Sequence, residues 1–217
     1  MSGAAGRPAV LGVLLAGGRS TRYGSPKARA QVRGVALADR ALAALEGAAD
    51  RVAVVANDPR DAGTSRHPVR PDVLPGRGVL GGILTAVRWA REEGRDAALV
   101  LACDMPLVPA ALLRRLAERA GPGRVVLPAS DGPRGMEPLC AAYGAATGPA
   151  IEDALGRGER AVISFFADVE IDVLPIDEVR RFGPPERLFW NVNRPEDRAR
   201  AERWLTADPG VGKEEGP

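Results

Sequence analysis

Short apolar runs and amphipathic segments alternate along the first half of the chain. The apolar runs at 10–16, 51–56 and 97–102 have the length and composition of buried parallel strands, which are covered on both faces of a sheet. Between them, apolar residues recur with helical spacing at 35–45 and 83–93. Because strands and helices alternate in this way, the pattern predicts an α/β fold with a mostly parallel, doubly wound sheet of the Rossmann-like type.

The second half of the chain mixes strands and helices less regularly. Its strands follow one another without clear crossover helices, which parallel neighbours would need, so we expect antiparallel additions to the sheet in the C-terminal half. We expect a single domain over residues 9–206, with loose termini at 1–8 and 207–217. The other predicted elements are a short strand beginning at Val69, strands at 125–128 and 169–174, extended segments at 137–143 and 189–193, and helices at 109–120, 147–155 and 195–205.

Composition argues against several classes of protein. Hydrophobic residues make up 45% of the 217 positions and charged residues 27%, values near those of globular proteins. The net charge of +2 and the aromatic content of 4% argue against a nucleic-acid-binding surface, which needs a basic excess or stacking rings. No apolar stretch approaches the length of a membrane span, so we expect no membrane partner.

The cysteines and the histidine add further limits. Cys103 and Cys140 are far apart and form no CxxC pair, so they predict no zinc site and favour a reducing, cytoplasmic compartment. The one histidine, His67, lies in a loop-like segment, where a surface position is a simpler interpretation than a place in a Ser-His-Asp triad. The sequence therefore contains few signs of histidine or zinc chemistry.

A polar, basic loop follows the first predicted strand. Gly17 and Gly18 allow a tight turn and a close backbone approach to a ligand, and successive N–H groups in such a turn can bind an anion. Arg22 and Lys27 add positive charge suited to a polyphosphate. The loop matches neither the Walker A motif nor the dinucleotide fingerprint. It is therefore either a phosphate site of another kind or an ordinary basic loop after a strand.

A second glycine-rich segment precedes the predicted helix at 83–93. Gly76, Gly78 and Gly81 formally match G-x-G-x-x-G, but two prolines interrupt the segment that should be the preceding strand. We therefore reject a dinucleotide-binding fold on this match. A glycine-rich loop at the start of a helix still suits close approach of a ligand to the backbone, so this segment is a candidate ligand contact.

Two aspartates follow predicted strands, at the edge of an open α/β sheet where ligands bind. Asp104 leaves the buried run at 97–102, and Pro106 stiffens the turn that holds it. Its carboxylate suits Mg²⁺, which takes one or two carboxylates together with phosphate oxygens and water. The alternative is a turn aspartate before a helix, which is common. Asp72 stands at a similar place, after the short strand that begins at Val69.

Two asparagines lie close together near the C-terminal end. Asn191 and Asn193 are two residues apart, so on an extended chain their side chains face the same way and present two amides to one ligand. The alternative is that Asn193 caps the helix that begins near Pro195. Both interpretations stay open at this point.

In their order along the chain, these segments resemble the motifs of the molybdenum cofactor guanylyltransferases, a branch of the nucleotidyltransferases with a glycosyltransferase-A-like fold. The resemblance covers about residues 10–205. The chain departs from the family pattern at three single positions. The family usually has methionine in place of Tyr23, aspartate in place of Pro26 and threonine in place of Arg194. In addition, the family's Gly-Pro-Leu-Ala-Gly is replaced here by Gly78-Val79-Leu80-Gly81-Gly82. The matching motifs are Leu15-Ala16-Gly17-Gly18, Arg22-Tyr23-Gly24, Lys27, Cys103-Asp104-Met105-Pro106, Glu137-Pro138-Leu139 and Asn191-Val192-Asn193-Arg194-Pro195-Glu196-Asp197.

The resemblance implies an enzyme of the nucleotide-diphospho-sugar transferase fold type. It implies transfer of GMP from GTP to the phosphate of Mo-molybdopterin, with Mg²⁺ on Asp104 and with catalysis by Lys27, Arg22 and Asp104. Other proteins of molybdenum cofactor biosynthesis, or proteins that accept the cofactor, are implied partners. Glu137 lies in a stretch that the family has near the acceptor, although a surface turn is the alternative. The implied binding residues are Leu15, Ala16, Gly17, Gly18, Lys27, Asp72, Gly78, Asp104, Asn191 and Asn193.

Two other functions stay open. A cytidylyltransferase, or a nucleotidyltransferase acting on another small phosphorylated acceptor, uses the same chemistry, and purine recognition can rest on backbone groups that a sequence does not display. A non-catalytic nucleotide-binding module would bind nucleotide without releasing pyrophosphate, although the presence of Lys27 and Asp104 argues against it. A glycosyltransferase is less favoured, because Asp104-Met105-Pro106 stands in place of a paired-carboxylate Asp-x-Asp.

Overall fold

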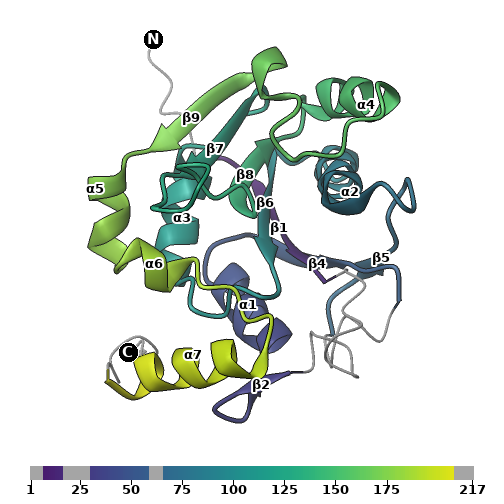
Figure 1. Ribbon diagram of the computed structural model, residues 1–217. Helices are drawn as coiled ribbons and strands as arrows, with labels where there is room; N and C mark the ends of the chain where they lie inside the picture. Colours follow the sequence, from purple (N-terminus) through teal and green to yellow (C-terminus); the bar gives the residue numbers. More distant parts are fainter. Residues whose placement is uncertain (1–6, 17–29, 59–65, 208–217) are drawn as a thin grey trace.

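The computed structural model describes residues 7–16, 30–58 and 66–207. A seven-stranded sheet with the order β5-β4-β1-β6-β8-β7-β9 forms its centre (Figure 1). β8 runs antiparallel to β6 and β7, whereas the other neighbouring strands are parallel, so the predicted α/β fold with antiparallel additions in the C-terminal half is confirmed. The strands are β1 (Val10–Leu15), β4 (Arg51–Val55), β5 (Val69–Arg70), β6 (Ala97–Ala102), β7 (Arg124–Pro128), β8 (Cys140–Gly144) and β9 (Glu170–Leu174).

The parallel strands end level with one another. Leu15, at the end of β1, pairs with Val55 of β4 and with Ala102 of β6. Val55 in turn pairs with Arg70, the last residue of β5. Since all four strands point the same way, the residues that follow them meet along one edge of the sheet, which is where ligands bind in open α/β folds.

Helices cover both faces of the sheet (Figure 1). α1 (Leu37–Glu46) and α3 (Ala110–Glu118) pack together on one face, and α2 (Gly78–Glu92) and α4 (Gly148–Gly156) pack together on the other. Among the described helices, none is long and apolar enough to cross a membrane.

The buried core has two parts because the central strands bury both of their faces. Along β6, Leu99 and Leu101 belong to the cluster that contains residues of α1 and α3, whereas Ala98 and Val100 belong to the cluster of α2 and α4. Successive side chains of a strand point to opposite faces, so a strand that is buried on both sides must be apolar throughout. This explains why the run at 97–102 contains no polar residue.

The glycine-rich segment before the predicted helix at 83–93 is itself helical, because α2 begins at Gly78. The prediction of a loop followed from the poor helix propensity of glycine, and tertiary packing overrides it here. A Cβ atom at Gly81 would lie 3.1 Å from Cβ of Arg77 and 3.2 Å from the carbonyl oxygen of Leu74. The position therefore favours glycine, because the helix start packs closely against the preceding turn.

The C-terminal segment connects the sheet to a final helix. α5 (Ile176–Val179) and α6 (Pro185–Leu188) were not predicted, because four residues show no helical periodicity. The segment 189–193, predicted to be extended, pairs with no strand among the described residues. α7 (Pro195–Ala207) agrees with the predicted final helix and packs against β2 (Gln31–Val32). The remaining short elements are β3 (Val35–Ala36), which pairs with β2, and the 3₁₀ turns η3 (Phe166–Asp168) and η4 (Arg180–Phe182).

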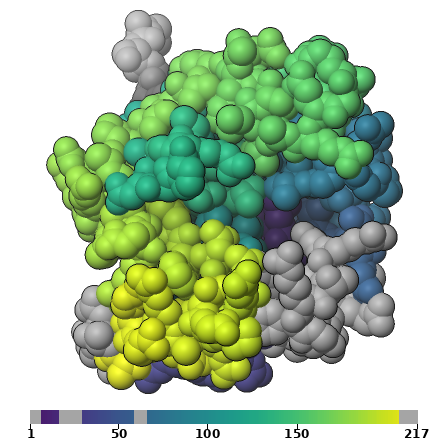
Figure 2. Space-filling view, in the orientation of Figure 1, coloured from purple at the N-terminus to yellow at the C-terminus, as the bar shows by residue number. Residues whose placement is uncertain are grey.

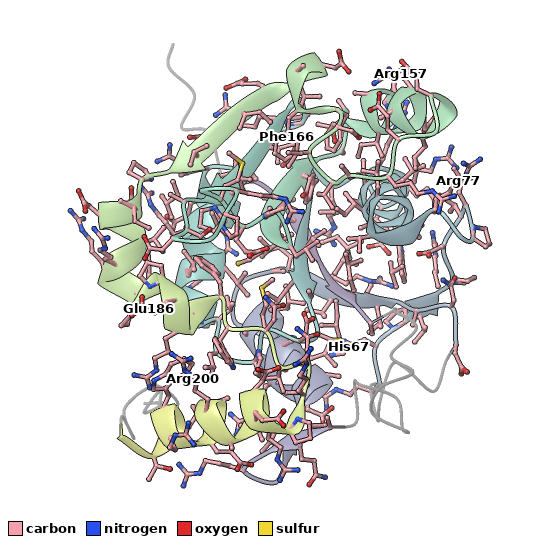
Figure 3. The ribbon with its side chains drawn as sticks, in the orientation of Figure 1. His67, Arg77, Arg157, Phe166, Glu186 and Arg200 are labelled. Carbon is pink, nitrogen blue, oxygen red and sulfur yellow. The ribbon has the colours of Figure 1, made fainter. Side chains whose placement is uncertain are left out.

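Aromatic contacts hold the chain just before α7 in place. The rings of Trp190 and Trp204 meet edge to face with centroids 5.4 Å apart, and the guanidinium of Arg200, labelled on α7 in Figure 3, lies 4.4 and 4.8 Å from the two centroids. Nε1 of Trp190 donates a hydrogen bond to the carbonyl oxygen of Asp197 at 3.1 Å. Val192 is fully buried. Val192 belongs to a buried cluster that includes Val32 of β2, so this segment packs against the first half of the protein.

Candidate active site

Backbone hydrogen bonds join the strand ends at the edge of the sheet. The N–H of Ala16 donates to the carbonyl of Val55 at 3.0 Å, and the N–H of Cys103 donates to the carbonyl of Leu15 at 3.2 Å. The chain leaving β1 is thus held between the chains leaving β4 and β6. The predicted contacts Leu15 and Ala16 lie at the centre of this edge. In Figure 2, purple atoms of residues 7–16 are visible in a hollow between the green upper half and the yellow C-terminal segment.

Asp104 stands in a tight turn at the end of β6. The N–H of Met105 donates to the carbonyl of Ala102 at 3.2 Å, which closes the turn. The side chain of Asp104 is half-buried, and its Oδ1 atom is shielded from solvent. The N–H of Val192 donates to the carbonyl of Asp104 at 2.9 Å. The fold therefore brings the segment with the two asparagines next to the aspartate, although the two are far apart in sequence.

Glu137 provides a second carboxylate near Asp104. Burial raises the pKa of Glu137, the hydrogen bond from the N–H of Leu139 lowers it, and the charge of Asp104 raises it. Oε1 of Glu137 accepts that hydrogen bond at 3.2 Å, and the carbonyl of Leu139 accepts one from the N–H of Ala102 at 2.9 Å. The Glu-Pro-Leu stretch is thereby fastened to the end of β6. Glu137 is half-buried there, so the alternative of an exposed surface turn does not describe it.

The strand that follows Glu137 is buried. Burial, with a smaller effect from the charge of Glu137, raises the pKa of the Cys140 thiol well above its ordinary value, and the same causes raise the pKa of Tyr143. The hydroxyl of Tyr143 donates a hydrogen bond to the carbonyl of Pro138 at 2.6 Å. Both Cys140 and Tyr143 are therefore neutral near pH 7, and the tyrosine fastens the Glu-Pro-Leu stretch to β8.

Asp72 follows β5, and its side chain lies beside α2. A Cβ atom at Gly82 would lie 3.5 Å from Oδ1 of Asp72 and 3.5 Å from Cδ2 of Leu15, so this glycine stands next to both the carboxylate and the end of β1. The side chain of Asn57, which follows β4, makes two hydrogen bonds to Asp72. The sequence analysis missed Asn57, although a polar residue directly after a predicted buried strand was a signal that could have found it.

Glycines turn the chain from Asp72 into α2. Gly76 and Gly78 have φ angles of +79° and +68°, in the left-handed region that favours glycine. No atom lies within 4 Å of a Cβ added at either position, so backbone conformation and not space calls for glycine. Gly78 is exposed at the helix start, next to Arg77, whose side chain is labelled in Figure 3. The role of Gly78 in nucleotide binding stays a prediction.

Asn191 and Asn193 lie beside the aspartate turn of β6, in an irregular segment and not on a strand. Nδ2 of Asn191 donates to the carbonyl of Phe189 at 3.2 Å. The N–H groups of Asn193 and Arg194 donate to Oδ2 of Asp197 at 2.9 and 2.8 Å. The carboxylate of Asp197 thus stabilises the start of α7, a capping contact that the sequence analysis did not foresee.

His67 pairs with a glutamate at the end of α1. Its Nε2 atom lies 2.9 Å from Oε1 of Glu46, and the imidazole is half-buried. The histidine lies at the surface in an exposed contact with this glutamate, which partly covers its ring. Figure 3 labels the residue, which lies on the chain that leads into β5.

Part of the predicted site lies outside the described residues. Gly17, Gly18, Arg22 and Lys27 fall within 17–29, so their assignment to phosphate binding and catalysis stays a prediction. The other predicted site residues approach one edge of the sheet through the contacts given above. These residues are Leu15, Ala16, Asp72, Asp104, Glu137, Asn191 and Asn193, with Gly78 at the start of α2.

The aspartate at the carboxyl end of β6, beside the end of β1, stands where ligands bind in open α/β sheets. A family profile described as the MobA-like NTP transferase domain matches residues 12–171. The chain belongs to the MobA-like NTP transferase family.

Individual relatives agree with this assignment. The chain is 37% identical over 202 residues to a probable molybdenum cofactor guanylyltransferase from Opitutus terrae, covering 90% of this chain and 96% of that protein. It is 30% identical over 201 residues to the molybdenum cofactor guanylyltransferase from Desulfosudis oleivorans, covering 92% of this chain and 97% of that protein. The predicted relationship to these enzymes is confirmed, and the chain is a nucleotidyltransferase.

Solved structures show the same fold. Molybdopterin-guanine dinucleotide biosynthesis protein A from Archaeoglobus fulgidus has a TM-score of 0.74 and 25% identity, covering 91% of this chain and 99% of that one. A nucleotidyl transferase from Methanothermobacter has a TM-score of 0.69 and 22% identity, covering 92% of this chain and 98% of that one. The second similarity is evidence for the fold alone.

Proposed function

We propose that this enzyme transfers GMP from GTP to the phosphate of Mo-molybdopterin, giving the molybdopterin guanine dinucleotide cofactor and pyrophosphate. The observation that carries the proposal is the gathering of Asp104, Glu137 and residues 191–193 near the end of β1. The names of the curated relatives support guanine as the base and the molybdenum cofactor as the product class.

The proposed reaction needs little covalent chemistry from the protein. An oxygen of the acceptor phosphate attacks the α-phosphorus of GTP and forms one P–O bond. The bond from the α-phosphorus to the oxygen that bridges to the β-phosphate breaks, and pyrophosphate leaves with its electron pair. A phosphate monoester is already anionic near neutral pH, so no general base is required. The protein has to align the two substrates and offset the charge on the transferring group.

The donor set at Asp104 fits Mg²⁺. This ion takes one or two carboxylates and fills its other positions with phosphate oxygens and water. Asp104 has Glu137 nearby, and the described part of the chain holds no cluster of three or more histidine, cysteine, aspartate or glutamate side chains. Such a sparse donor set suits an ion shared with a triphosphate. When bound, Mg²⁺ would supply Lewis-acid charge to the phosphate oxygens.

In this proposal, the remaining predicted residues bind the substrates. Lys27 and Arg22 supply positive charge at the α-phosphorus and at the leaving pyrophosphate. The backbone at residues 15–18 holds the base and the phosphates, and Asp72 contacts the nucleoside. The position of Gly82, next to both Asp72 and Leu15, supports this division.

We also propose a cytoplasmic enzyme that exchanges its substrate or product with other proteins of molybdenum cofactor biosynthesis or with proteins that accept the cofactor. Cys103 and Cys140 are buried cysteine thiols, which supports a reducing compartment. Fractionation of cells that express the chain, followed by cross-linking, tests both the compartment and the partners.

Pyrophosphate release tests the proposed reaction. Purified protein is incubated with Mg²⁺, a source of Mo-molybdopterin and one of GTP, CTP, ATP or UTP. Release that requires both GTP and the acceptor supports the proposal. Preference for CTP would keep the mechanism and replace the product with a cytosine dinucleotide. Nucleotide binding without release, in folded and metal-supplied protein, would favour a binding module and contradict the proposal.

A further inference from the structure

Asn57 and Asp72 form a pair with two hydrogen bonds at the edge of the sheet. Nδ2 of Asn57 donates to Oδ2 of Asp72 at 2.8 Å, and Oδ1 of Asn57 accepts from the N–H of Asp72 at 2.9 Å. One amide therefore binds both the side chain and the backbone of the aspartate. Asn57 follows β4 and Asp72 follows β5, so the pair also joins the ends of two neighbouring strands.

A buried threonine holds the next residue from the side of α2. The N–H of Val73 donates to Oγ1 of Thr85 at 3.0 Å, and this hydroxyl donates to the carbonyl of Gly81 at 2.9 Å. Thr85 is 1% exposed, and its bond to Gly81 is buried whereas the bond from Val73 is partly buried. The loop that carries Asp72 is thus fastened to both β4 and α2, and its backbone position is well defined.

The two oxygens of the Asp72 carboxylate have different surroundings. Oδ2 accepts the hydrogen bond from Asn57. Oδ1 lies on the side of Gly82 and Leu15, because a Cβ atom at Gly82 would be 3.5 Å from Oδ1 and 3.5 Å from Cδ2 of Leu15. Asn57 therefore engages one oxygen, while the other faces Gly82 of α2, a residue that also lies next to Leu15 of β1.

We propose that Asn57 is a positioning residue that holds the carboxylate of Asp72 for the nucleoside; this inference rests on the proposed function. Asp72 accepts hydrogen bonds from the ribose hydroxyls or from the exocyclic amino group of guanine, since both groups donate to a carboxylate. Asn57 acts through Asp72 and touches no substrate. Without the amide, the carboxylate would rotate and hydrate freely, and the nucleotide would have to order it on binding.

Kinetics of Asn57→Ala, Asp72→Ala and the double variant test the inference. Asn57→Ala is expected to raise KM for GTP about tenfold, the effect of one hydrogen bond to a charged group, and to leave kcat and the acceptor KM within about twofold. Because Asn57 acts through Asp72, the double variant is expected to match Asp72→Ala. An unchanged GTP KM in Asn57→Ala, or additive losses in the double variant, would overturn the inference.

A variant in which Asn57 and Asp72 exchange places separates an effect on GTP binding from an effect on folding. In Asn57→Asp combined with Asp72→Asn, donor and acceptor trade places, so both hydrogen bonds can form and the thermal midpoint should recover. GTP affinity should stay low, because an amide then replaces the carboxylate that faces the site. Recovery of GTP affinity would overturn the inference. Glu152→Gln is the matched control, since it weakens an exposed hydrogen bond that joins Glu152 of α4 to Arg88 in the C-terminal half of α2.

Nucleotide analogues identify the contacted donor. The penalty of Asn57→Ala should shrink with 2′,3′-dideoxyguanosine triphosphate if Asp72 binds ribose, and with inosine triphosphate if it binds the guanine amino group. An equal penalty with GTP and both analogues would overturn the inference. Wild-type protein that releases no pyrophosphate would refute the proposed function instead. In that case, the dissociation constants of GTP for the same variants test the inference about Asn57. A constant for Asn57→Ala equal to that of the wild type would contradict this inference.

Discussion

The parallel and mixed sides of the sheet place their site residues by different means. On the parallel side, Leu15 and Asp104 lie at or just beyond strands that end level, so the hydrogen-bond ladder sets their positions. On the mixed side, Glu137 and residues 191–193 lie in irregular segments that are held by individual contacts, such as the bond from Val192 to the carbonyl of Asp104. A ladder shares its stability among many bonds, whereas a loop depends on a few.

This difference leads to different expectations for substitutions. Removing a side chain at a strand end should change the chemistry while the backbone stays in place. Removing a contact under a loop should instead displace a binding group and lower stability together. Substitutions on the two sides of the sheet test this contrast, and the same activity and unfolding assays measure their effects.

The largest effect is expected for Asp104→Ala. Loss of the proposed Mg²⁺ ligand should lower kcat about a thousandfold or more, because the transferring phosphate loses its main counter-charge. The thermal midpoint should stay near that of the wild type, since backbone bonds hold the turn. Pyrophosphate release and thermal unfolding measure the two quantities, with the exposed Asp177→Ala as control. Near-normal turnover would remove Asp104 from the metal site.

Lys27→Ala should have the next largest effect. Removal of a cation assigned to the α-phosphorus should lower kcat by about a hundredfold or more without unfolding the protein. Single-turnover kinetics with saturating GTP measure the chemical step directly. Arg66→Ala removes an exposed cation from a loop salt bridge and serves as the control. Retained turnover in Lys27→Ala would identify the segment after β1 as an ordinary basic loop.

Asp197→Ala should affect the mixed side alone. The N–H groups of Asn193 and Arg194 lose their acceptor, and loss of such a cap costs about 1 kcal/mol. The acceptor KM should rise about fivefold and the thermal midpoint should fall, while the GTP KM stays unchanged. Asp197→Asn keeps an acceptor oxygen and should restore much of the loss. Equal increases in both KM values would show that the two sides are not independent.

The smallest effect is expected for Glu137→Gln. Burial raises the pKa of Glu137 above its ordinary value of 4.5, and the charge of Asp104 adds to this against the opposing bond from Leu139. A carboxyl with a raised folded-state pKa contributes stability at low pH that is lost as the pH rises through that pKa. Glu137→Gln should therefore raise the free energy of unfolding at pH 7, in metal-free buffer.

The pH dependence of the increase in the free energy of unfolding tests whether the buried charge of Glu137 causes it. The advantage of Glu137→Gln should disappear as the pH falls below 4.5, where the glutamate is protonated in both the folded and the unfolded chain. Denaturant unfolding at both pH values measures it. A gain of the same size at both values would show that the buried charge is not responsible.

The sequence alone determined the strands of the parallel side and the family. The runs at 10–16, 51–56 and 97–102 agree with β1, β4 and β6 to within one residue at each end, because strands buried on both faces must be apolar throughout. The order of the motifs identified the molybdenum cofactor guanylyltransferases, to which the chain is related. Local periodicity and motif order are properties of the chain itself, so no contact had to be known.

Only the tertiary structure decided which side chains meet. Asn57 binds Asp72, Glu137 lies near Asp104, and the N–H of Val192 reaches the carbonyl of that aspartate, and none of these pairs is close in sequence. Each contact depends on strand order and loop packing, which local patterns do not encode. The start of α2 before residue 83 also depended on packing, because residues 80–82 are buried although glycine has a weak helix propensity. Propensity is a small free energy per residue, and burial at the end of a well-packed helix outweighs it.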